Sequence, residues 1–136
     1  MNQSRFEVVP IGRIESALTD LASAPKQGDE GSPDAWLVVE PALLEGLHGL
    51  QADDQVVVLT WLDRARRDVL AVHPRDDVTN PQQGVFNTRS ASRPNPIGLH
   101  QVEIVSIDGN RLQVRNLEAL NGTPIVDIKP VLSARS

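Results

Sequence analysis

Short apolar runs, each ended by proline, glycine or aspartate, constrain the fold of this chain more than any other feature. The longest is QVVVLTWL at 55–62, which is typical of a buried β-strand. Other strand-like segments lie at 6–16, 35–40, 69–72 and 124–128. Pro10 places the first of these at a sheet edge or a bulge, because proline cannot donate a ladder hydrogen bond. Ten prolines and nine glycines in 136 residues also imply many turns and short elements.

The clearest local pattern is a β-hairpin in the last third of the chain. Two strand-like segments, 101–107 and 111–117, flank Asp108-Gly109-Asn110, and Asp-Gly is favoured in turns that need positive φ. Residues 41–50, PALLEGLHGL, predict one short helix, since proline suits the first helical turn and glycine its end. Strands do not alternate with long helices, which excludes a Rossmann sheet. We therefore predict an all-β fold: one closed or nearly closed β-barrel with one or two small helices.

Length and composition limit the organisation of the chain and its environment. A mass of 14.8 kDa predicts a single domain over residues 1–136, and a 40% apolar content can form its core. No apolar run approaches the ~20 residues of a membrane helix, and the first residues lack the apolar segment of a signal peptide. The chain has no cysteine, which excludes disulfides and thiolate metal sites. Together these features predict a cytoplasmic protein.

Charge is distributed unevenly along the chain. The net charge is −5, with eleven arginines and two lysines, which argues against a protein that coats nucleic acid non-specifically. The segment from Arg64 to Arg93 nevertheless carries six arginines and three aspartates, so it is locally basic. Two interpretations are open: this segment forms a surface that faces an anion, or its arginines pair with nearby acids on a solvated face.

The most informative stretch is GVFNTRSASRPNPIGLH at 84–100, which we call the long signature. Pro94 and Pro96 fix their own φ and push Arg93 and Asn95 toward extended conformations. The pattern predicts a stiff, extended strip whose polar side chains have little conformational entropy left to lose on binding. The alternative is a proline-stiffened loop across the barrel mouth, in which arginines cap backbone carbonyls.

A second stretch, LNGTPIVDIKP at 120–130, is called the short signature. Asn121-Gly122 is a tight-turn dipeptide that brings backbone amides close to whatever lies beside it. Asp127 and Lys129 are two residues apart on an extended segment, so they face the same side, either as a binding pair or as a surface ion pair. The chain's three histidines lack metal-ligand spacing, so no metal site is predicted, and its two tryptophans are expected in the core.

The two signatures closely resemble those of the TsaA/TrmO-like family, and the resemblance extends over most of the chain. IGRIES at 11–16, PKQ at 25–27, GLHGL at 46–50 and LTWLDRA at 59–65 occur in the family's order. The resemblance implies an S-adenosyl-L-methionine-dependent tRNA methyltransferase built on a single β-barrel. It implies methylation at N6 of a threonylcarbamoyl-modified adenosine next to the tRNA anticodon. It also implies a homodimer that holds the cofactor near the subunit interface.

The resemblance also implies site residues. The implied cofactor contacts are Lys26, Gln27, Asp63, Arg64, Arg89, Leu99, Asn121, Gly122 and Thr123. From the polar residues of the two signatures we predict Arg93, Asn95, Asp127 and Lys129 as substrate contacts. We assign no catalytic base, because methyl transfer from a sulfonium mainly demands approach and alignment of donor and acceptor. An N–H flanked by a carbamoyl group is also more acidic than that of a plain amine.

Differences from the family pattern support a second hypothesis. Family members usually carry histidine where Asp63 stands, aspartate where Asn121 stands and tyrosine where Val131 stands. We also expect no separate C-terminal tRNA-binding domain in this chain, so another small methyl acceptor is an alternative to tRNA. The second hypothesis is a non-catalytic module that binds S-adenosyl-L-methionine or regulates through it. A purely structural dimerisation barrel is a third, which leaves the polar RPNPIG segment unexplained.

Overall fold

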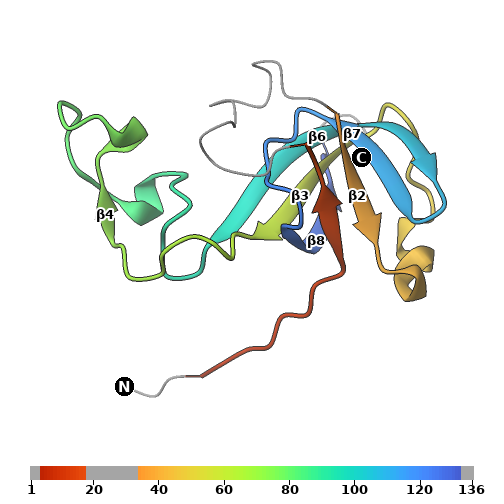
Figure 1. The fold of residues 1–136 in the computed structure, drawn as a ribbon, viewed down its shortest axis with the longest axis horizontal. Helices are drawn as coiled ribbons and strands as arrows, with labels where there is room; N and C mark the ends of the chain where they lie inside the picture. Colours follow the sequence, from red (N-terminus) through yellow and green to blue (C-terminus); the bar gives the residue numbers. More distant parts are fainter. Residues whose placement is uncertain (1–3, 18–33, 133–136) are drawn as a thin grey trace.

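A six-stranded antiparallel barrel forms the centre of the computed structural model, which describes residues 4–17 and 34–132 (Figure 1). The strands follow the order β1-β2-β7-β6-β3-β8 and close on one another. Their bounds are Gly12–Glu15 (β1), Ala35–Val39 (β2), Gln55–Trp61 (β3), Ile97–Asp108 (β6), Arg111–Arg115 (β7) and Pro124–Pro130 (β8). The predicted all-β barrel is confirmed, and the predicted hairpin is the β6–β7 pair.

The core fills the barrel because alternate residues of each strand face inward. In β3 the inward positions are Val56, Val58 and Thr60, all fully buried. The other large aliphatic side chains of the barrel strands that are fully buried are Ile14, Leu37, Val102, Ile104, Leu112, Val114 and Ile125. The expectation that both tryptophans lie in the core was wrong, since alternation places them on outward, half-buried positions. There Arg111 covers Trp36 at 4.9 Å and Arg67 covers Trp61 at 5.2 Å, measured to the ring centroids.

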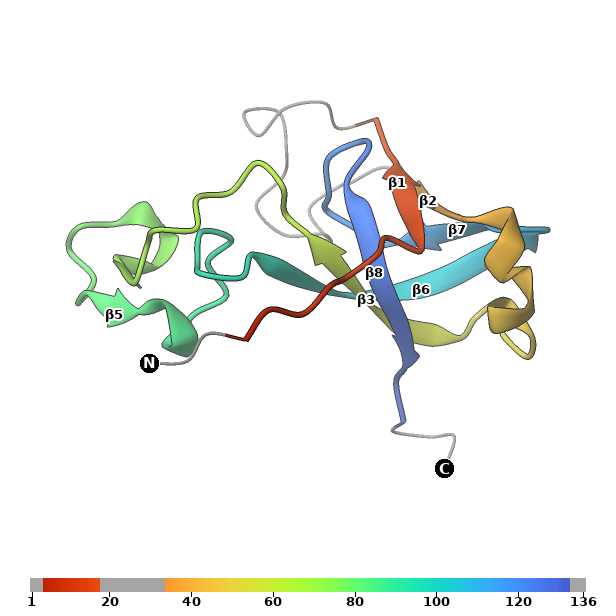
Figure 2. The same ribbon diagram turned by 90° about the horizontal axis from the view of Figure 1, so that it is seen from below.

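The first strand is shorter than the predicted 6–16. Residues 4–10 are exposed and run away from the barrel, as both ribbon views show (Figures 1 and 2). Pairing begins when the Ile11 N–H donates to the Ile125 carbonyl at 2.8 Å, one residue after Pro10. Pro10 has no backbone N–H to donate, which explains why pairing begins only at Ile11. β1 then pairs with β2 on one side and β8 on the other.

The barrel is closed by a short contact. β8 pairs with β1 at Gly12↔Ile125 and Arg13↔Pro124 and then continues beside β3 alone. Beyond that point the N–H of Ile128 donates to Asp127 Oδ1, at 2.8 Å. The outer edge of β8 after Ile125 is therefore next to no strand within the described residues.

One short 3-10 helix, η2 (Pro41–Leu47), replaces the predicted helix over 41–50. It begins with proline as expected, and it ends before Gly49, whose φ of 95° does not suit a helix. None of its residues is buried, so packing does not favour the extension of this turn into an α-helix. η2 therefore lies on the outside of the barrel, between β2 and β3.

The segment between β3 and β6 projects sideways from the barrel (Figures 1 and 2). It holds a two-stranded ribbon of β4 (Ala71–Val72) and β5 (Gln83–Gly84), with 3-10 turns η3 (Pro74–Asp76) and η4 (Val85–Asn87). The strand expected at 69–72 is thus a two-residue strand outside the barrel. Within residues 4–17 and 34–132 no helix is long and apolar enough to cross a membrane.

Candidate functional site

A cavity of about 310 Å³ lies at the end of the barrel where β3 and β7 end and β6 and β8 begin. Three chain segments meet there: 62–66, the long signature and the loop 118–123. Its lining residues are Leu62, Asp63, Arg64, Ala65, Arg66, Ala91, Ser92, His100, Glu118, Ala119, Leu120 and Thr123. The fold thus brings the predicted Asp63, Arg64 and Thr123 together. A volume of this order lies at the lower end of small-molecule sites.

The long signature forms one wall of the cavity, folded around Arg93. The Arg93 guanidinium donates to the carbonyls of Val85, Ser90 and Thr88, at 2.8, 2.9 and 3.1 Å. The chain bends at 93–95, so the prediction of an extended strip was wrong. Arginine carries five donors in a fixed fork, and here three carbonyls of one loop accept from them. Arg93 therefore follows the alternative in which an arginine caps backbone carbonyls. Its hydrogen bonds hold the loop that forms this wall.

The same loop is tied to the segment after β3. The Arg93 N–H donates to the Arg66 carbonyl at 3.0 Å, and the Arg66 N–H donates to Ser92 Oγ at 3.2 Å. Arg67 donates to the Pro94 carbonyl at 2.7 Å and to Asn95 Oδ1 at 3.0 Å. Asn95 is therefore held in place by an arginine, outside the cavity.

The turn of the short signature forms the opposite wall. Thr123 is 6% exposed, and its hydroxyl donates to the Leu120 carbonyl at 2.7 Å. Gly122 has a φ of +87° and its N–H donates to the Ile14 carbonyl, so this amide serves the barrel rather than a ligand. Asn121 Oδ1 accepts from the Ser16 N–H at 3.1 Å. Thr123 thus lines the cavity, while the two residues before it secure the turn to β1.

Sequence reasoning missed the polar group on the inner wall. His100 Nε2 and Thr60 Oγ1 share a hydrogen bond of 2.9 Å, and Thr60 is fully buried. Burial lowers the pKa of His100 to about 4, so the imidazole is uncharged at neutral pH. The available signal was period two, which places Gly98 and His100 on the same inward face as Pro96.

The other charged side chains of the cavity lie at its rim. Asp63, Arg64 and Arg66 are exposed, and Glu118 is half-buried. Arg66 pairs with Asp68 at 2.8 Å, and this hydrogen-bonded partner lowers the pKa of the Asp68 carboxyl. Leu62, Ala91, Ala119 and Leu120 supply apolar surface.

This lining suits S-adenosyl-L-methionine, which joins a charged sulfonium amino acid to an uncharged adenine. The carboxylates and guanidinium groups of the rim can bind the charged half, and the apolar surface can bind the base. No three metal-ligating side chains gather within the part of the chain that the structure describes.

The remaining predicted residues lie elsewhere. Arg89 and Leu99 do not line the cavity, and Leu99 is 49% exposed on the outward face of β6. Asp127 and Lys129 form an exposed ion pair at 3.6 Å, the surface alternative considered for them. Lys26 and Gln27 lie outside the described residues.

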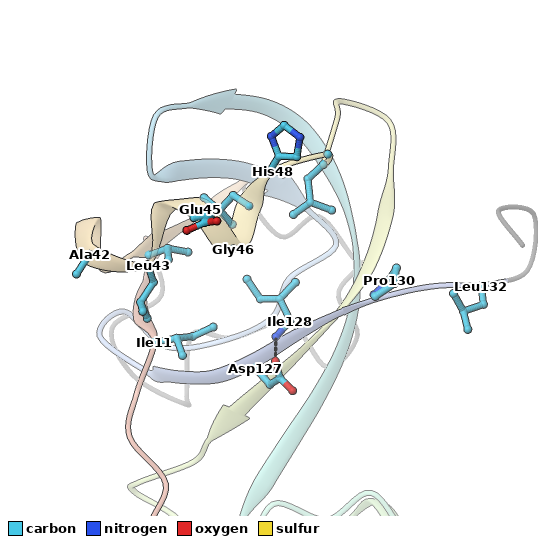
Figure 3. Close-up of a pocket in the computed structure, with 14 residues that line it drawn as sticks. Ile11, Ala42, Leu43, Glu45, Gly46, His48, Asp127, Ile128, Pro130 and Leu132 are labelled. Carbon is cyan, nitrogen blue, oxygen red and sulfur yellow. Dashed lines mark hydrogen bonds between the residues drawn. The ribbon is translucent and has the colours of Figure 1, made fainter.

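A larger groove of about 970 Å³ lies at the other end of the barrel, between η2 and the end of β8 (Figure 3). Leu43 of η2 and Ile11, Ile128 and Leu132 give it an apolar lining. Asp127 also borders it, with its side chain on the Ile128 N–H. Of the predicted site residues, Asp127 alone lines this groove, among those that the structure describes.

Comparison with known proteins gives one consistent set of relatives. Residues 13–135 match the tRNA-methyltransferase O N-terminal domain. An S-adenosyl-L-methionine-binding protein of Archaeoglobus fulgidus is 42% identical over 120 residues, covering 88% of this chain and 85% of that protein. A probable S-adenosyl-L-methionine-binding protein of Methanothermobacter thermautotrophicus is 38% identical over 130 residues, covering 96% of this chain and 93% of the relative.

Solved structures that resemble this chain point to the same family. The crystal structure of TrmO from Pseudomonas aeruginosa superposes with a TM-score of 0.76 at 29% identity, covering 99% of this chain. A second TrmO structure gives 0.77 at 27% identity and covers 100% of this chain. The present chain spans about three-fifths of each solved chain, 59% and 60% respectively.

Proposed function

We propose a function from one premise: the chain belongs to the tRNA-methyltransferase O N-terminal domain family. The proposed function is binding of S-adenosyl-L-methionine in the 310 Å³ cavity and transfer of its methyl group to an acceptor. One observation carries the proposal: three implied cofactor contacts from distant parts of the chain, Asp63, Arg64 and Thr123, line the same cavity. Relatives of this chain are described as S-adenosyl-L-methionine-binding proteins.

The residues of the cavity have distinct tasks in this proposal. The Asp63 carboxylate at the rim attracts the positive sulfonium, and Arg64 binds the carboxylate of the methionine moiety. Thr123 and the loop held by Arg93 fix the walls, so that donor and acceptor meet in one geometry. When bound, the cofactor supplies a methyl carbon that an acceptor nitrogen attacks as the carbon–sulfur bond breaks, with the N–H proton lost to water.

For the acceptor we propose N6 of threonylcarbamoyl-adenosine next to the anticodon of tRNA. The family match, to a tRNA-methyltransferase domain, supports tRNA as the substrate class, and the modified adenosine is what the resemblance implies. Exposed Arg75 and Arg89, on the segment that projects from the barrel, offer charge for the phosphates. Asn95, held by Arg67 beside the cavity wall, is a candidate contact for the modified base.

We further propose that the chain acts as a homodimer. Ile97 and Leu99 leave 47% and 49% of their surface exposed on the outward face of β6. Arg89 and Leu99 are implied cofactor contacts that miss the cavity of their own chain, so a second copy can bring them to it. Light scattering on wild type and Leu99→Asp tests this: we expect a dimer that the charged variant dissociates.

A non-catalytic cofactor-binding module is the second candidate. It is favoured by Asp63, where the family usually carries histidine, and by Asn121, whose side-chain oxygen accepts from the Ser16 N–H. In this role the chain would bind the cofactor and respond to it without methyl transfer.

Calorimetry with S-adenosyl-L-methionine, followed by incubation with methyl-labelled cofactor and tRNA lacking the mark, tests the proposal. We expect binding, and label on N6 of the modified adenosine by mass spectrometry of digested nucleosides. Asp63→Lys should weaken binding at least tenfold, whereas Asp108→Lys, at the exposed hairpin tip, should leave it unchanged. Absence of binding by wild type would refute the proposal, and binding without transfer to any RNA would favour the module.

A further inference from the structure

A hydrogen-bonded polar pair, buried Thr60 and half-buried His100, stands out in the barrel interior because the rest of it is almost entirely apolar. Of the described residues, Thr60 and Thr123 are the buried polar ones, and both lie at the end of the barrel that holds the cavity. Thr123 bonds a carbonyl of its own turn, but Thr60 bonds the ring of His100, which lines the cavity. The interior therefore presents an imidazole to the cavity, supported from behind by a hydroxyl.

Gly98 makes the space for this pair. It lies directly opposite Thr60 in the β3–β6 ladder and shares the inward face of β6 with His100. A Cβ at Gly98 would overlap Thr60 Oγ1 and lie 2.8 Å from His100 Nε2. Any larger residue would thus displace the imidazole from the inner wall.

One ring nitrogen of His100 remains available to a ligand. Nε2 bonds Thr60, and within residues 4–17 and 34–132 this is the hydrogen bond that the ring makes. The imidazole is uncharged at neutral pH, so Nδ1 offers either a donor or an acceptor without a charge. Such a group suits a neutral heterocycle better than a carboxylate or an ammonium group.

The surroundings of His100 agree with this chemistry. The cavity walls supply Leu62, Ala119 and Leu120, while the full charges belong to rim residues such as Asp63 and Arg64. An adenine ring has apolar faces and polar nitrogen edges, so it matches this part of the cavity. The charged methionine moiety matches the rim.

We propose that His100 orients the bound cofactor, with Nδ1 bonding the adenine at the inner end of the cavity and Thr60 and Gly98 fixing the ring. This proposal rests on the proposed function, because it takes the cavity to be the S-adenosyl-L-methionine site. His100 is a binding residue in it, and no step of methyl transfer passes through the imidazole.

Two ligands test the proposal: S-adenosyl-L-methionine, and 5′-methylthioadenosine, which keeps the adenine nucleoside but lacks the amino acid. Calorimetry should show that His100→Leu weakens the binding of both ligands at least tenfold. His48→Leu, at the exposed residue that follows η2 and lies outside the cavity, is the matched control and should bind both like wild type. Thr60→Val, which removes the hydroxyl and keeps the shape, should weaken both by a few-fold.

A measurement on the wild type avoids dependence on variants that fail to fold. In ¹⁵N-histidine NMR, either ligand should shift the Nδ1 signal of His100 and leave those of His48 and His73 in place. An unmoved His100 signal, or full affinity in a folded His100→Leu protein, overturns the proposed role of His100 but not the proposed function. Weaker binding of S-adenosyl-L-methionine but not of 5′-methylthioadenosine overturns the adenine assignment. Failure of the wild type to bind either ligand refutes the proposed function itself, and this inference with it.

Discussion

The two ends of the barrel each carry a concave surface, and the two surfaces differ in both size and chemistry. The groove beside η2, drawn in Figure 3, is about 970 Å³ in volume. This is three times the roughly 310 Å³ of the cavity between the signatures. The groove is lined by partly exposed leucines, and Leu132 is 69% exposed. The cavity is lined instead by an imidazole, that of His100, which is hydrogen-bonded to the buried Thr60 hydroxyl behind it.

This difference in lining indicates which of the two concave surfaces is the better candidate for a binding site. Burying a polar side chain opposes folding unless its hydrogen bonds are satisfied, so the Thr60–His100 pair needs its own support from the barrel. A surface leucine needs none, since apolar atoms make up much of any protein surface. The proposed cofactor site is therefore the smaller cavity, and we interpret the groove as a gap between η2 and β8.

Acid should produce the largest effect, and the imidazole at the cavity end should cause a separable part of it. The pKa of His100 is about 4 when folded and near 6.5 when unfolded, so below pH 6.5 the unfolded chain binds a proton that the folded chain does not. The stabilisation is complete above pH 6.5 and falls by about 3 kcal/mol as pH drops to 4. The charged groups lining the cavity with His100 are Asp63, Arg64, Arg66 and Glu118.

Urea unfolding at pH 7 and pH 4 measures this effect. His100→Leu should lose about 3 kcal/mol less than wild type over that range, because it lacks the buried titrating group. His48→Leu, at the groove, should lose as much as wild type. Equal losses in all three proteins would show that the buried imidazole does not set the acid sensitivity.

Glycine-to-alanine substitutions compare the two ends with the same added methyl group. Gly98→Ala should lower the free energy of unfolding by about 2 kcal/mol and weaken cofactor binding at least tenfold, because the methyl overlaps Thr60 Oγ1. Gly46→Ala, in η2 with nothing within 4 Å of its Cβ, should change stability by less than about 0.5 kcal/mol. Chemical denaturation and calorimetry measure both. A tolerated Gly98→Ala would contradict the close packing of the cavity wall.

Polar substitution in the groove should have the smallest effect. Leu43 is 44% exposed, so Leu43→Ser should reduce stability by about 1 kcal/mol or less and leave cofactor affinity within twofold of wild type. Thermal unfolding and calorimetry with S-adenosyl-L-methionine give both values. A large loss of cofactor affinity would indicate that the cofactor binds in the groove and not in the cavity.

The barrel could be predicted from sequence because its strands repeat a simple pattern. The apolar run 55–62 and the Asp108-Gly109 turn identify β3 and the β6–β7 hairpin directly. The β4–β5 ribbon could not be predicted as a separate unit, since each of its strands has two residues and no periodicity to detect. The η2 turn looks like a helix in sequence because what limits it, the absence of a buried face, is a property of packing.

The candidate site could be predicted in part. The resemblance identified Asp63, Arg64 and Thr123, which the fold brings to one cavity. The bends at 93–95 were missed because proline fixes only φ locally, while Arg93 gathers three carbonyls from residues earlier in the loop. His100 was missed because its role depends on a side-chain hydrogen bond to Thr60, forty residues earlier on the neighbouring strand β3.

The unpaired edge of β8 has a consequence for how copies of this chain meet one another. An open strand edge usually invites further strands and so leads toward fibrils. Here the Ile128 N–H is already bonded by Asp127, and Pro130 has no N–H to give. An incoming chain thus finds neither donor at these two positions, and the barrel gains protection against uncontrolled polymerisation from a carboxylate and an imino acid.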